Sequence, residues 1–362
     1  MNNKLQQFIA GFSFLILLYC FYQMNHPQKV QVQKAVYNWK TNFSRSTYYN
    51  AYEDSFLTSH QIKKMYVKML DIDYSEAAGI FPVSKTEINY WVEPNTDSLN
   101  YVPVVYITNK VLQHLKEEDM DYYAKRILSF ALRIETYTKR PTQEIQIDCD
   151  WTKTTKETYF NLLLCIQKWA PQFQYSVTLR LYPFKYREEL GIPPVDRVML
   201  MVYNIDNAKK FKSANSIFNV NEAAKYLARK DYPLPMDFAL PTFSWTLVFR
   251  NQQFLKVISE NIIPEIIAPR YVGDVAKIQL QKLEENVYLV KEATSGYQEN
   301  ALRAGDIIKV ESCGEKELLE ARLLISRFAI NTKTTIALFD LDQTDLEKIP
   351  YEKIEAAYFS MH

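Results

Sequence analysis

Short hydrophobic runs with a period of two recur along the chain and alternate with amphipathic helical stretches. Alternating strand and helix patterns favour βα units around a parallel sheet. Eight runs rich in Val, Ile, Leu and Tyr have this character, and eight is the number of strands that closes a (β/α)₈ barrel. We therefore predict such an α/β barrel over residues 35–362. Its strands are expected at residues 35–40, 64–73, 101–108, 144–151, 175–184, 197–204, 236–249 and 334–342.

Helical patterns fill most of the gaps between these runs, at residues 119–138, 155–170, 220–229 and 315–328. In the second helix, one apolar stripe is expected to cover the sheet. Its members are Tyr159, Leu162, Leu163, Ile166 and Trp169. An open doubly wound sheet is the alternative architecture, but no glycine-rich phosphate loop follows the first run. With only seven glycines in the chain, we expect no nucleotide cofactor.

The gap between the seventh and eighth runs is too long for one crossover. Two segments within residues 277–313 have the pattern of short strands around turns. We predict a small β-rich insertion at about residues 264–313, placed before the helix at 315–328. It is expected to cap the mouth of the barrel or to extend its rim.

The N-terminus differs from the rest of the chain. Residues 8–22 carry no charge, which predicts a signal anchor or signal peptide within residues 1–24, followed by a linker at 25–34. The run reaches only the lower limit of about 17 residues for spanning a bilayer, and no small-x-small cleavage site follows it. An uncleaved anchor is favoured, which predicts a membrane-anchored, extracytoplasmic protein. Lipoprotein processing at Cys20 is the alternative, but Tyr19 stands where a small residue is expected.

Charge and ligand-forming residues exclude two classes of partner. The 43 basic and 42 acidic residues give a net charge of +1 without long blocks of one sign, so nucleic acid is not expected as a partner. The four cysteines and four histidines show no metal-type spacing. No metal site of this kind is expected.

Acidic residues concentrate where the predicted strands end. Barrel enzymes carry their chemistry at the carboxyl ends of the strands. The acids at the ends of the second, fourth and eighth runs are Asp71, Asp73, Asp148, Asp150, Asp340 and Asp342. As catalytic carboxylates we predict Asp150, Asp148, Asp73 and Asp340.

The fourth run alternates strictly, with Ile145, Ile147 and Cys149 on one face. These residues are expected to face the helices. The lumen-facing set is then Glu144, Gln146, Asp148 and Asp150, opposite Ser176, Thr178, Arg180 and Tyr182 of the next strand. Buried carboxylates require partners, and Arg180 and Tyr182 are the predicted ones. We expect the deeper Glu144 and Gln146 to belong to a satisfied polar core, and Asp150 at the mouth to belong to a site.

Aromatic residues also gather near the predicted strand ends. Aromatic faces stack on apolar faces of sugar rings, and acids bind hydroxyl groups, so this combination predicts a carbohydrate groove. Any one of these aromatic residues is more often explained by rim packing, so the prediction depends on their common location. The residues predicted to bind the substrate are Trp39, Trp151, Arg180, Tyr182, Tyr203 and Trp245.

At residues 145–152, I-Q-I-D-C-D-W-T resembles the fourth-strand signature D-G-x-D-x-D-x-E of the glycoside hydrolase family 18 chitinase-like barrels. It is also similar to a family of bacterial exported proteins with glycoside-hydrolase-like barrels, in which a Gln-x-Asp-x-Asp strand leads into a helix with a Tyr. Asp148 and Asp150 match the second and third Asp of the signature. Ile145 replaces the first Asp, and Thr152 occupies the position of the catalytic Glu.

The resemblance implies a glycan-acting barrel, but threonine is no general acid near neutral pH. Another carboxyl group would have to supply the proton, with Asp73, Asp340, Asp342, Glu188 and Glu189 as candidates. A glycoside hydrolase with Asp150 assisted by Asp148 is one hypothesis. A non-catalytic glycan-binding or envelope-assembly protein is the second. A third treats Asp148 and Asp150 as ligands of calcium or magnesium.

Overall fold

The structure is a computed structural model that describes residues 32–46, 51–91, 98–229, 231–258, 280–292, 302–328, 330 and 333–359. The predicted anchor at residues 1–24, Cys20 and most of the linker at 25–34 lie outside the described residues. Within the described ranges, no helix has both the length and the apolar character needed to cross a membrane.

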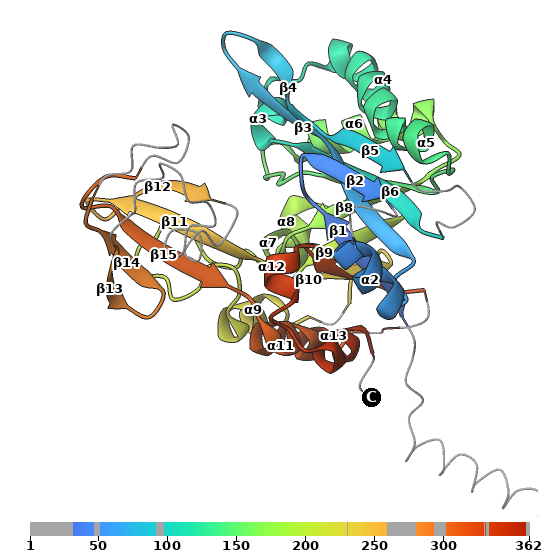
Figure 1. Ribbon diagram of the computed structural model, residues 1–362. Coiled ribbons are helices and arrows are strands. Elements are labelled where there is room, and N and C mark those ends of the chain that lie inside the picture. The colour runs from blue at the N-terminus through green and yellow to red at the C-terminus, as the bar shows by residue number, and fades with distance from the viewer. Residues whose placement is uncertain are drawn as a thin grey trace, which may run out of the picture.

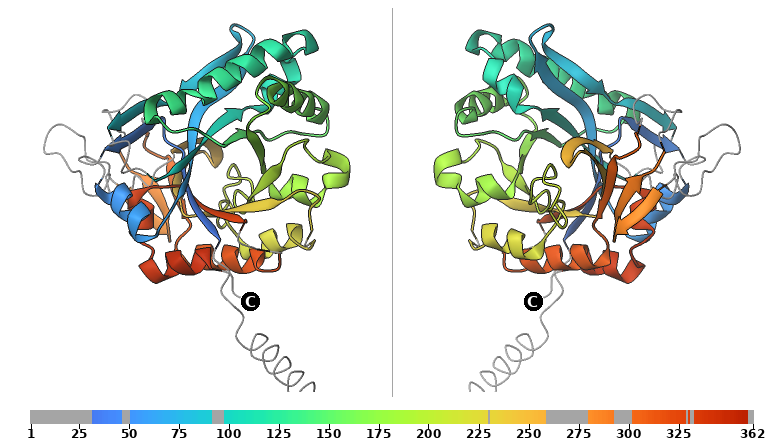
Figure 2. Two further views of the ribbon diagram at one scale, coloured as in Figure 1. Left: turned by 90° about the vertical axis from the view of Figure 1, so that its right-hand side faces the viewer. Right: turned by 90° about the vertical axis from the view of Figure 1, so that its left-hand side faces the viewer.

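Eight parallel strands close into a barrel, with helices outside it (Figures 1 and 2). The ring runs β1-β16-β10-β9-β8-β7-β6-β3, and β3 pairs with β1 to close it. The predicted (β/α)₈ barrel is confirmed, because each of the eight runs supplies one strand of the barrel. These strands are β1 (Gln33–Asn38), β3 (Lys64–Ser75), β6 (Asn100–Ile107), β7 (Glu144–Asp148), β8 (Gln174–Leu179), β9 (Arg197–Met201), β10 (Met236–Pro241) and β16 (Thr335–Phe339).

The helices follow the expected order along the chain. In α6, Tyr159, Leu162, Leu163 and Ile166 are buried as expected. The expectation for Trp169 was wrong: it is 43% exposed, and its indole N–H donates to Asp121 on the neighbouring α4. The described helices are α2 (Ala51–Ser59), α3 (Asn109–His114), η1 (Glu117–Asp119), α4 (Met120–Ala131), α5 (Arg133–Thr138), α6 (Lys156–Trp169), α7 (Leu181–Lys185), α8 (Arg187–Leu190), α9 (Val220–Tyr226), α11 (Glu315–Ile325), α12 (Gln343–Leu346) and α13 (Tyr351–Tyr358).

The insertion is present but begins earlier than predicted. The seventh hydrophobic run is two strands, because β10 ends at Pro241 and β11 starts a separate antiparallel sheet at Ser244. Asp345 fixes this corner by accepting hydrogen bonds from the backbone and side chain of Ser244. Both strands are buried, so their continuous apolar pattern hides the corner. The sheet contains β11 (Ser244–Arg250), β12 (Gln253–Ile258), β13 (Leu280–Glu284), β14 (Val287–Val290) and β15 (Ile307–Ser312).

Three further strands accompany β3. The strand β4 (Gly79–Lys85) continues β3 as an antiparallel hairpin, and β2 (Asn42–Ser46) pairs in parallel with β5 (Glu87–Trp91). The pairing of β3 with β6 slips by one residue between Lys68 and Leu70. Such a bulge reverses the facing of every later side chain in the strand.

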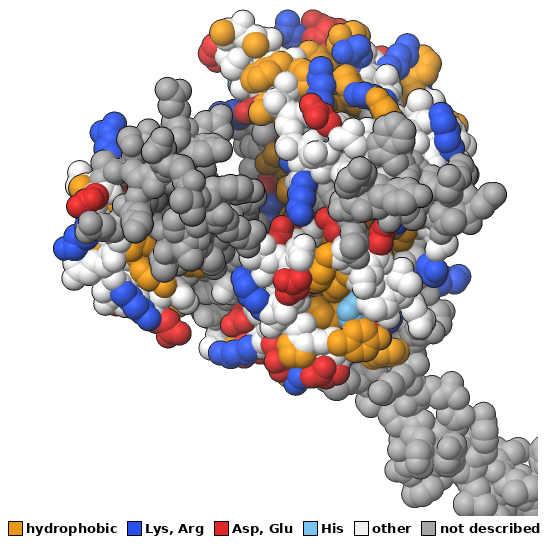
Figure 3. All heavy atoms as spheres, viewed as in Figure 1, with side chains coloured by type: hydrophobic (Ala, Val, Ile, Leu, Met, Phe, Trp, Pro, Cys, Tyr) orange, Lys and Arg blue, Asp and Glu red, His pale blue; other side chains and the backbone are white. Residues whose placement is uncertain are grey.

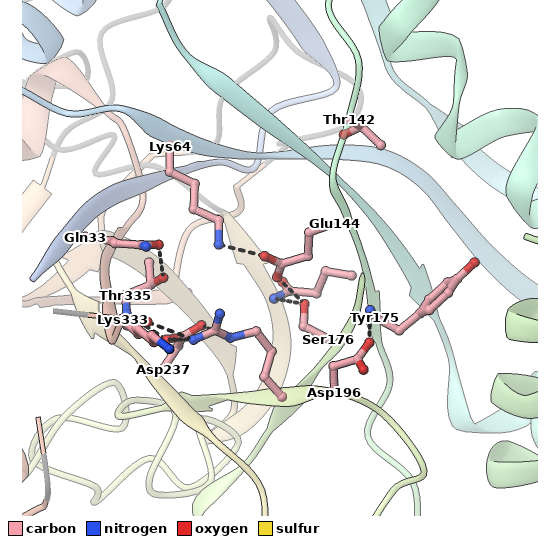
Figure 4. A network of polar contacts seen from close by, with 12 residues as sticks. Gln33, Lys64, Thr142, Glu144, Tyr175, Ser176, Asp196, Asp237, Lys333 and Thr335 are labelled. Atoms are coloured by element: carbon pink, nitrogen blue, oxygen red, sulfur yellow. Dashed lines mark hydrogen bonds and ion pairs between the residues drawn. The ribbon is translucent and has the colours of Figure 1, made fainter. Parts of the chain in front are cut away.

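The deep half of the lumen is a polar network (Figure 4). Glu144 accepts hydrogen bonds from Lys64 at 2.6 Å and from Ser176 at 2.6 Å. Gln146 donates to Ser176 and accepts from the Tyr37 hydroxyl at 2.7 Å. Glu144 and Gln146 therefore form the satisfied polar core that their depth in the barrel predicted.

A second ion pair lies in the same layer. Arg197 at the start of β9 lies 2.7 Å from Asp237 at the start of β10. The carboxylate of Asp237 also accepts from the backbone N–H of Thr335 at 2.6 Å. These contacts tie the amino-terminal ends of three adjacent strands together and indicate a structural role for this end.

Candidate functional site

The candidate site lies at the carboxyl-terminal ends of the barrel strands. The chain leaves β3 at this end to form the β3–β4 hairpin, and it leaves β10 at this end to form the insertion sheet (Figure 1). The face drawn in Figure 3 carries Lys/Arg and Asp/Glu side chains interspersed, without a large area of one sign. The end of the barrel bordered by these additions is the end where the predicted acids gather.

Asp148 is the last residue of β7 and is buried in the lumen. Its carboxylate accepts a hydrogen bond from Thr178 at 2.5 Å. Burial raises the pKa of Asp148 to about 6, while Arg180 opposes that rise and Asp150 adds to it. Asp148 therefore exchanges its proton in mildly acidic solution.

Asp150 lies two residues beyond the end of β7, nearer to solvent. The Arg180 guanidinium binds its two carboxylate oxygens, at 2.7 Å through Nε and 3.4 Å through Nη2. The Asp150 side chain is 47% exposed, so the ion pair is open on one side. Tyr106 of β6 lies nearby: its pKa is raised chiefly by burial and then by Asp150 and Asp148. Tyr106, Asp148, Asp150 and Arg180 form one half of the mouth, the opening of the lumen at the carboxyl-terminal ends of the strands.

The bulge in β3 determines which acid of this strand reaches Asp148. Without a bulge, Lys68 and Asp71 would point to opposite faces, yet Lys68 Nζ lies 3.1 Å from Asp71 Oδ2. The Asp71 charge helps to raise the pKa of Asp148. Asp73 instead lies in the hairpin and accepts a hydrogen bond from Thr108 at 2.5 Å, which lowers its pKa. Asp71 is thus the acid beside Asp148, and the one-residue bulge left no signal in the sequence.

Asp340 follows β16 and is half-buried. Burial raises its pKa to about 7, and the neighbouring Asp342 adds to that rise. Lys40 acts in the opposite direction and lies 3.3 Å from Asp342. Asp340 also helps to raise the pKa of Tyr203, after burial and together with Asp148, which places these groups around one part of the lumen.

Aromatic side chains form the other half of the mouth. Trp39 and Phe339 have ring centroids 5.4 Å apart, Phe339 and Phe243 are also 5.4 Å apart, and Phe243 and Trp245 are 5.6 Å apart. All four are partly exposed. The buried ring of Tyr203 packs on Phe339, with ring centroids 4.9 Å apart, and supports this aromatic row. Sequence reasoning missed Phe243 and Phe339, although both also stand at strand ends.

Two of the predicted binding residues do not line the lumen. Trp151 is only 4% exposed, donates to the carbonyl of Leu190 at 3.0 Å and stacks on Tyr159, so neither ring face is open to a sugar. Tyr182 was expected to face the lumen, but the chain turns into α7 directly after Arg180. Tyr182 is therefore 53% exposed on the outside of the barrel rim.

The remaining candidate acids lie at the surface. Glu188 is paired with Arg229, and Glu189 lies 2.9 Å from Lys153. The Thr152 hydroxyl is within hydrogen-bond distance of Thr154 and Thr155 at the start of α6. Across the described ranges, no group of three or more His, Cys, Asp or Glu side chains is arranged to hold a metal ion.

The sequence matches no protein-family model and no curated protein. Among solved structures, the chain is similar to a chitinase from Bacteroides thetaiotaomicron, with TM-score 0.50 and 6% identity over 91% of this chain and 96% of that one. The spore cortex-lytic enzyme SleL of Bacillus megaterium QM B1551 gives TM-score 0.49 and 12% identity, over 92% and 74% of the two chains. A glycoside hydrolase family 18 N-acetylglucosaminidase from Paenibacillus barengoltzii gives 0.46 and 10%, over 91% and 99%. At such identities the likeness concerns the fold alone: the chain is similar to chitinase-like (β/α)₈ barrels.

Proposed function

We propose that this protein binds a glycan at the mouth of its barrel. The observation that carries the proposal is the division of the mouth into two halves. The aromatic row stands on β1, β16 and the β10–β11 corner, whereas Tyr106, Asp148, Asp150 and Arg180 stand on β6, β7 and β8. In the order of the ring these two sets of strands are opposite each other.

A saccharide matches such a site chemically. Its apolar C–H faces pack on aromatic rings, while its hydroxyl groups bind carboxylates and guanidinium groups. The fourth-strand resemblance and the fold of the solved neighbours support the same class of ligand. The uncharged segment at residues 8–22 supports a location outside the cytoplasm, attached to the membrane.

Of the two candidate functions, the geometry favours a protein that binds a glycan and does not cleave it by the chitinase-type mechanism. Thr152 stands at the position of the acid, and the Arg180 guanidinium binds both carboxylate oxygens of Asp150. A hydrolase is the second candidate, and Asp340 favours it. A half-buried carboxyl with a pKa of about 7 keeps a proton near neutral pH, as a general acid must.

Calorimetric binding and release of reducing sugar, measured on a panel of bacterial and plant polysaccharides, test the two candidates. We expect the wild type to bind at least one glycan. Trp39→Ala should weaken that binding about tenfold, because truncating a central aromatic residue of an interface typically costs more than 1 kcal/mol. Trp169→Ala removes an exposed tryptophan on α6 and serves as the matched control.

Each outcome separates the candidates. Binding without sugar release supports the first, and release that disappears in Asp340→Asn supports the hydrolase. Equal binding by Trp39→Ala and wild type, with both folded by thermal melting, would refute the proposed site. If the wild type binds no member of the panel, the glycan function itself is wrong.

A further inference from the structure

Two tyrosines outside the mouth form an exposed aromatic pair. Tyr182 is 53% exposed and Tyr186 is 37% exposed. Their ring centroids are 4.6 Å apart, at an interplanar angle of 46°. Lys185 lies with its ammonium group 5.3 Å from the ring centroids of both Tyr186 and Tyr226. This double cation–π contact links the pair to α9 and holds the Tyr186 ring in place.

The pair follows the mouth residues closely along the chain. Helix α7 begins at Leu181, directly after Arg180, whose guanidinium binds Asp150. The loop after β7 is joined to α8 as well, since Lys153 pairs with Glu189. Tyr182 is therefore two residues along the chain from a side chain of the site, and α7, which carries it, directly follows the carboxyl-terminal end of β8 (Figure 1).

Apart from Lys185, the charged residues that follow the pair in the chain are matched with opposite charges. Arg187 lies 3.0 Å from Asp231, and Arg229 is paired with Glu188. Tyrosine rings and hydroxyl groups are then the main features offered to a ligand. Such a surface suits a neutral, hydroxyl-rich ligand better than a strongly charged partner, which would need unpaired charges of opposite sign.

We propose that the ligand is a glycan chain of several sugar units that leaves the mouth beside Arg180 and continues over Tyr182 and Tyr186. This inference rests on the proposed glycan-binding function and adds the length and the path of the ligand. The first units of the chain occupy the mouth. The further units of a chain stack on the tyrosine pair.

Isothermal calorimetry with oligomers of two to six units tests this path, using β-1,4-linked N-acetylglucosamine and glucose series and the full chain. We expect the affinity of the wild type to rise with length. The double variant Tyr182→Ala, Tyr186→Ala should bind the hexamer about tenfold more weakly and the dimer within twofold of wild type. Tyr182→Phe, Tyr186→Phe retains both rings and should keep most of the length dependence.

The control is Tyr122→Ala, which removes a similarly exposed tyrosine on α4 and should bind both lengths as wild type does. An unchanged length dependence in the double alanine variant would overturn the inference and leave the proposed function standing. An equal loss at every length would also overturn it, because the tyrosines would then contact the first units. If the wild type binds no oligomer of either series, both the proposed function and this inference fail.

Discussion

Replacement of Asp340 by Asn should make the protein more stable at neutral pH and leave its stability at pH 4 nearly unchanged. The pKa of Asp340 in the folded protein is raised from 3.8 to about 7, first by burial and then by Asp342. Between these two pH values the unfolded chain has lost the proton and the folded chain has kept it. The free energy of unfolding therefore falls as the pH rises from about 4 to about 7. Asparagine cannot ionise and removes this loss.

The size of the effect follows from the pKa difference. Each pKa unit corresponds to about 1.4 kcal/mol, so the rise to about 7 corresponds to at most about 4 kcal/mol. Because the side chain is only half-buried, solvent screening reduces this figure, and we expect about 2 kcal/mol at pH 8. Below pH 4 both forms of the wild type are protonated, so the variant gains nothing there.

Urea unfolding of the wild type and Asp340→Asn at pH 4, 5.5, 7 and 8 measures this difference. Asp73→Asn is an informative control because the Thr108 hydrogen bond lowers the pKa of Asp73. That substitution should cost stability at neutral pH, and the cost should be smaller at pH 4, near the ordinary pKa of an aspartate. A stability difference for Asp340→Asn that is the same at all four pH values would refute a raised pKa, and with it the assignment of Asp340 as a proton donor.

Three further predictions concern the lumen and the rim. Glu144→Gln leaves the Lys64 ammonium buried without its anion and should lower the free energy of unfolding by about 3–5 kcal/mol in urea titrations; a loss below 1 kcal/mol would contradict the network. Arg180→Met removes the cation that opposes the raised pKa of Asp148. Carboxyl carbon NMR should then show this pKa above its wild-type value of about 6, and an unchanged value would count against an interaction between Arg180 and Asp148. Trp151→Phe deletes a buried donor and should cost about 1–3 kcal/mol of stability without changing glycan affinity, whereas loss of binding would return Trp151 to the site.

The barrel was predictable because the hydrophobic pattern of each strand differs from that of the helices. Strands buried on both sides still differ from the amphipathic helices between them in length and composition. What the pattern cannot show is a change of sheet within one apolar run, as at Pro241, or a single extra residue inside a strand, as at Met69. Both events leave the local composition unchanged and redirect every side chain that follows.

The site was predictable in part for the same reason. The alternation of β7 correctly gave Glu144, Gln146 and Asp148 as the lumen row, because that strand is regular to its last residue. The predictions were wrong beyond the point where the regular alternation of a strand ends. Tyr182 was counted as a continuing strand residue, but it belongs to a helix that starts at Leu181, and only the three-dimensional path of the chain distinguishes the two.

The acids in the two halves of the lumen differ in their contacts with cations. In the deep layer, Glu144 and Asp237 lie at 2.6 and 2.7 Å from cations, although burial still raises the pKa of Asp237 to about 6. At the mouth, Asp148 and Asp340 have pKa values raised to about 6 and about 7, because burial outweighs the cations near them. A raised pKa alone does not separate the two layers, because structural ion pairs perturb acids as well. The mouth differs from the deep layer because its acids lie beside a partly exposed ion pair and partly exposed aromatic rings.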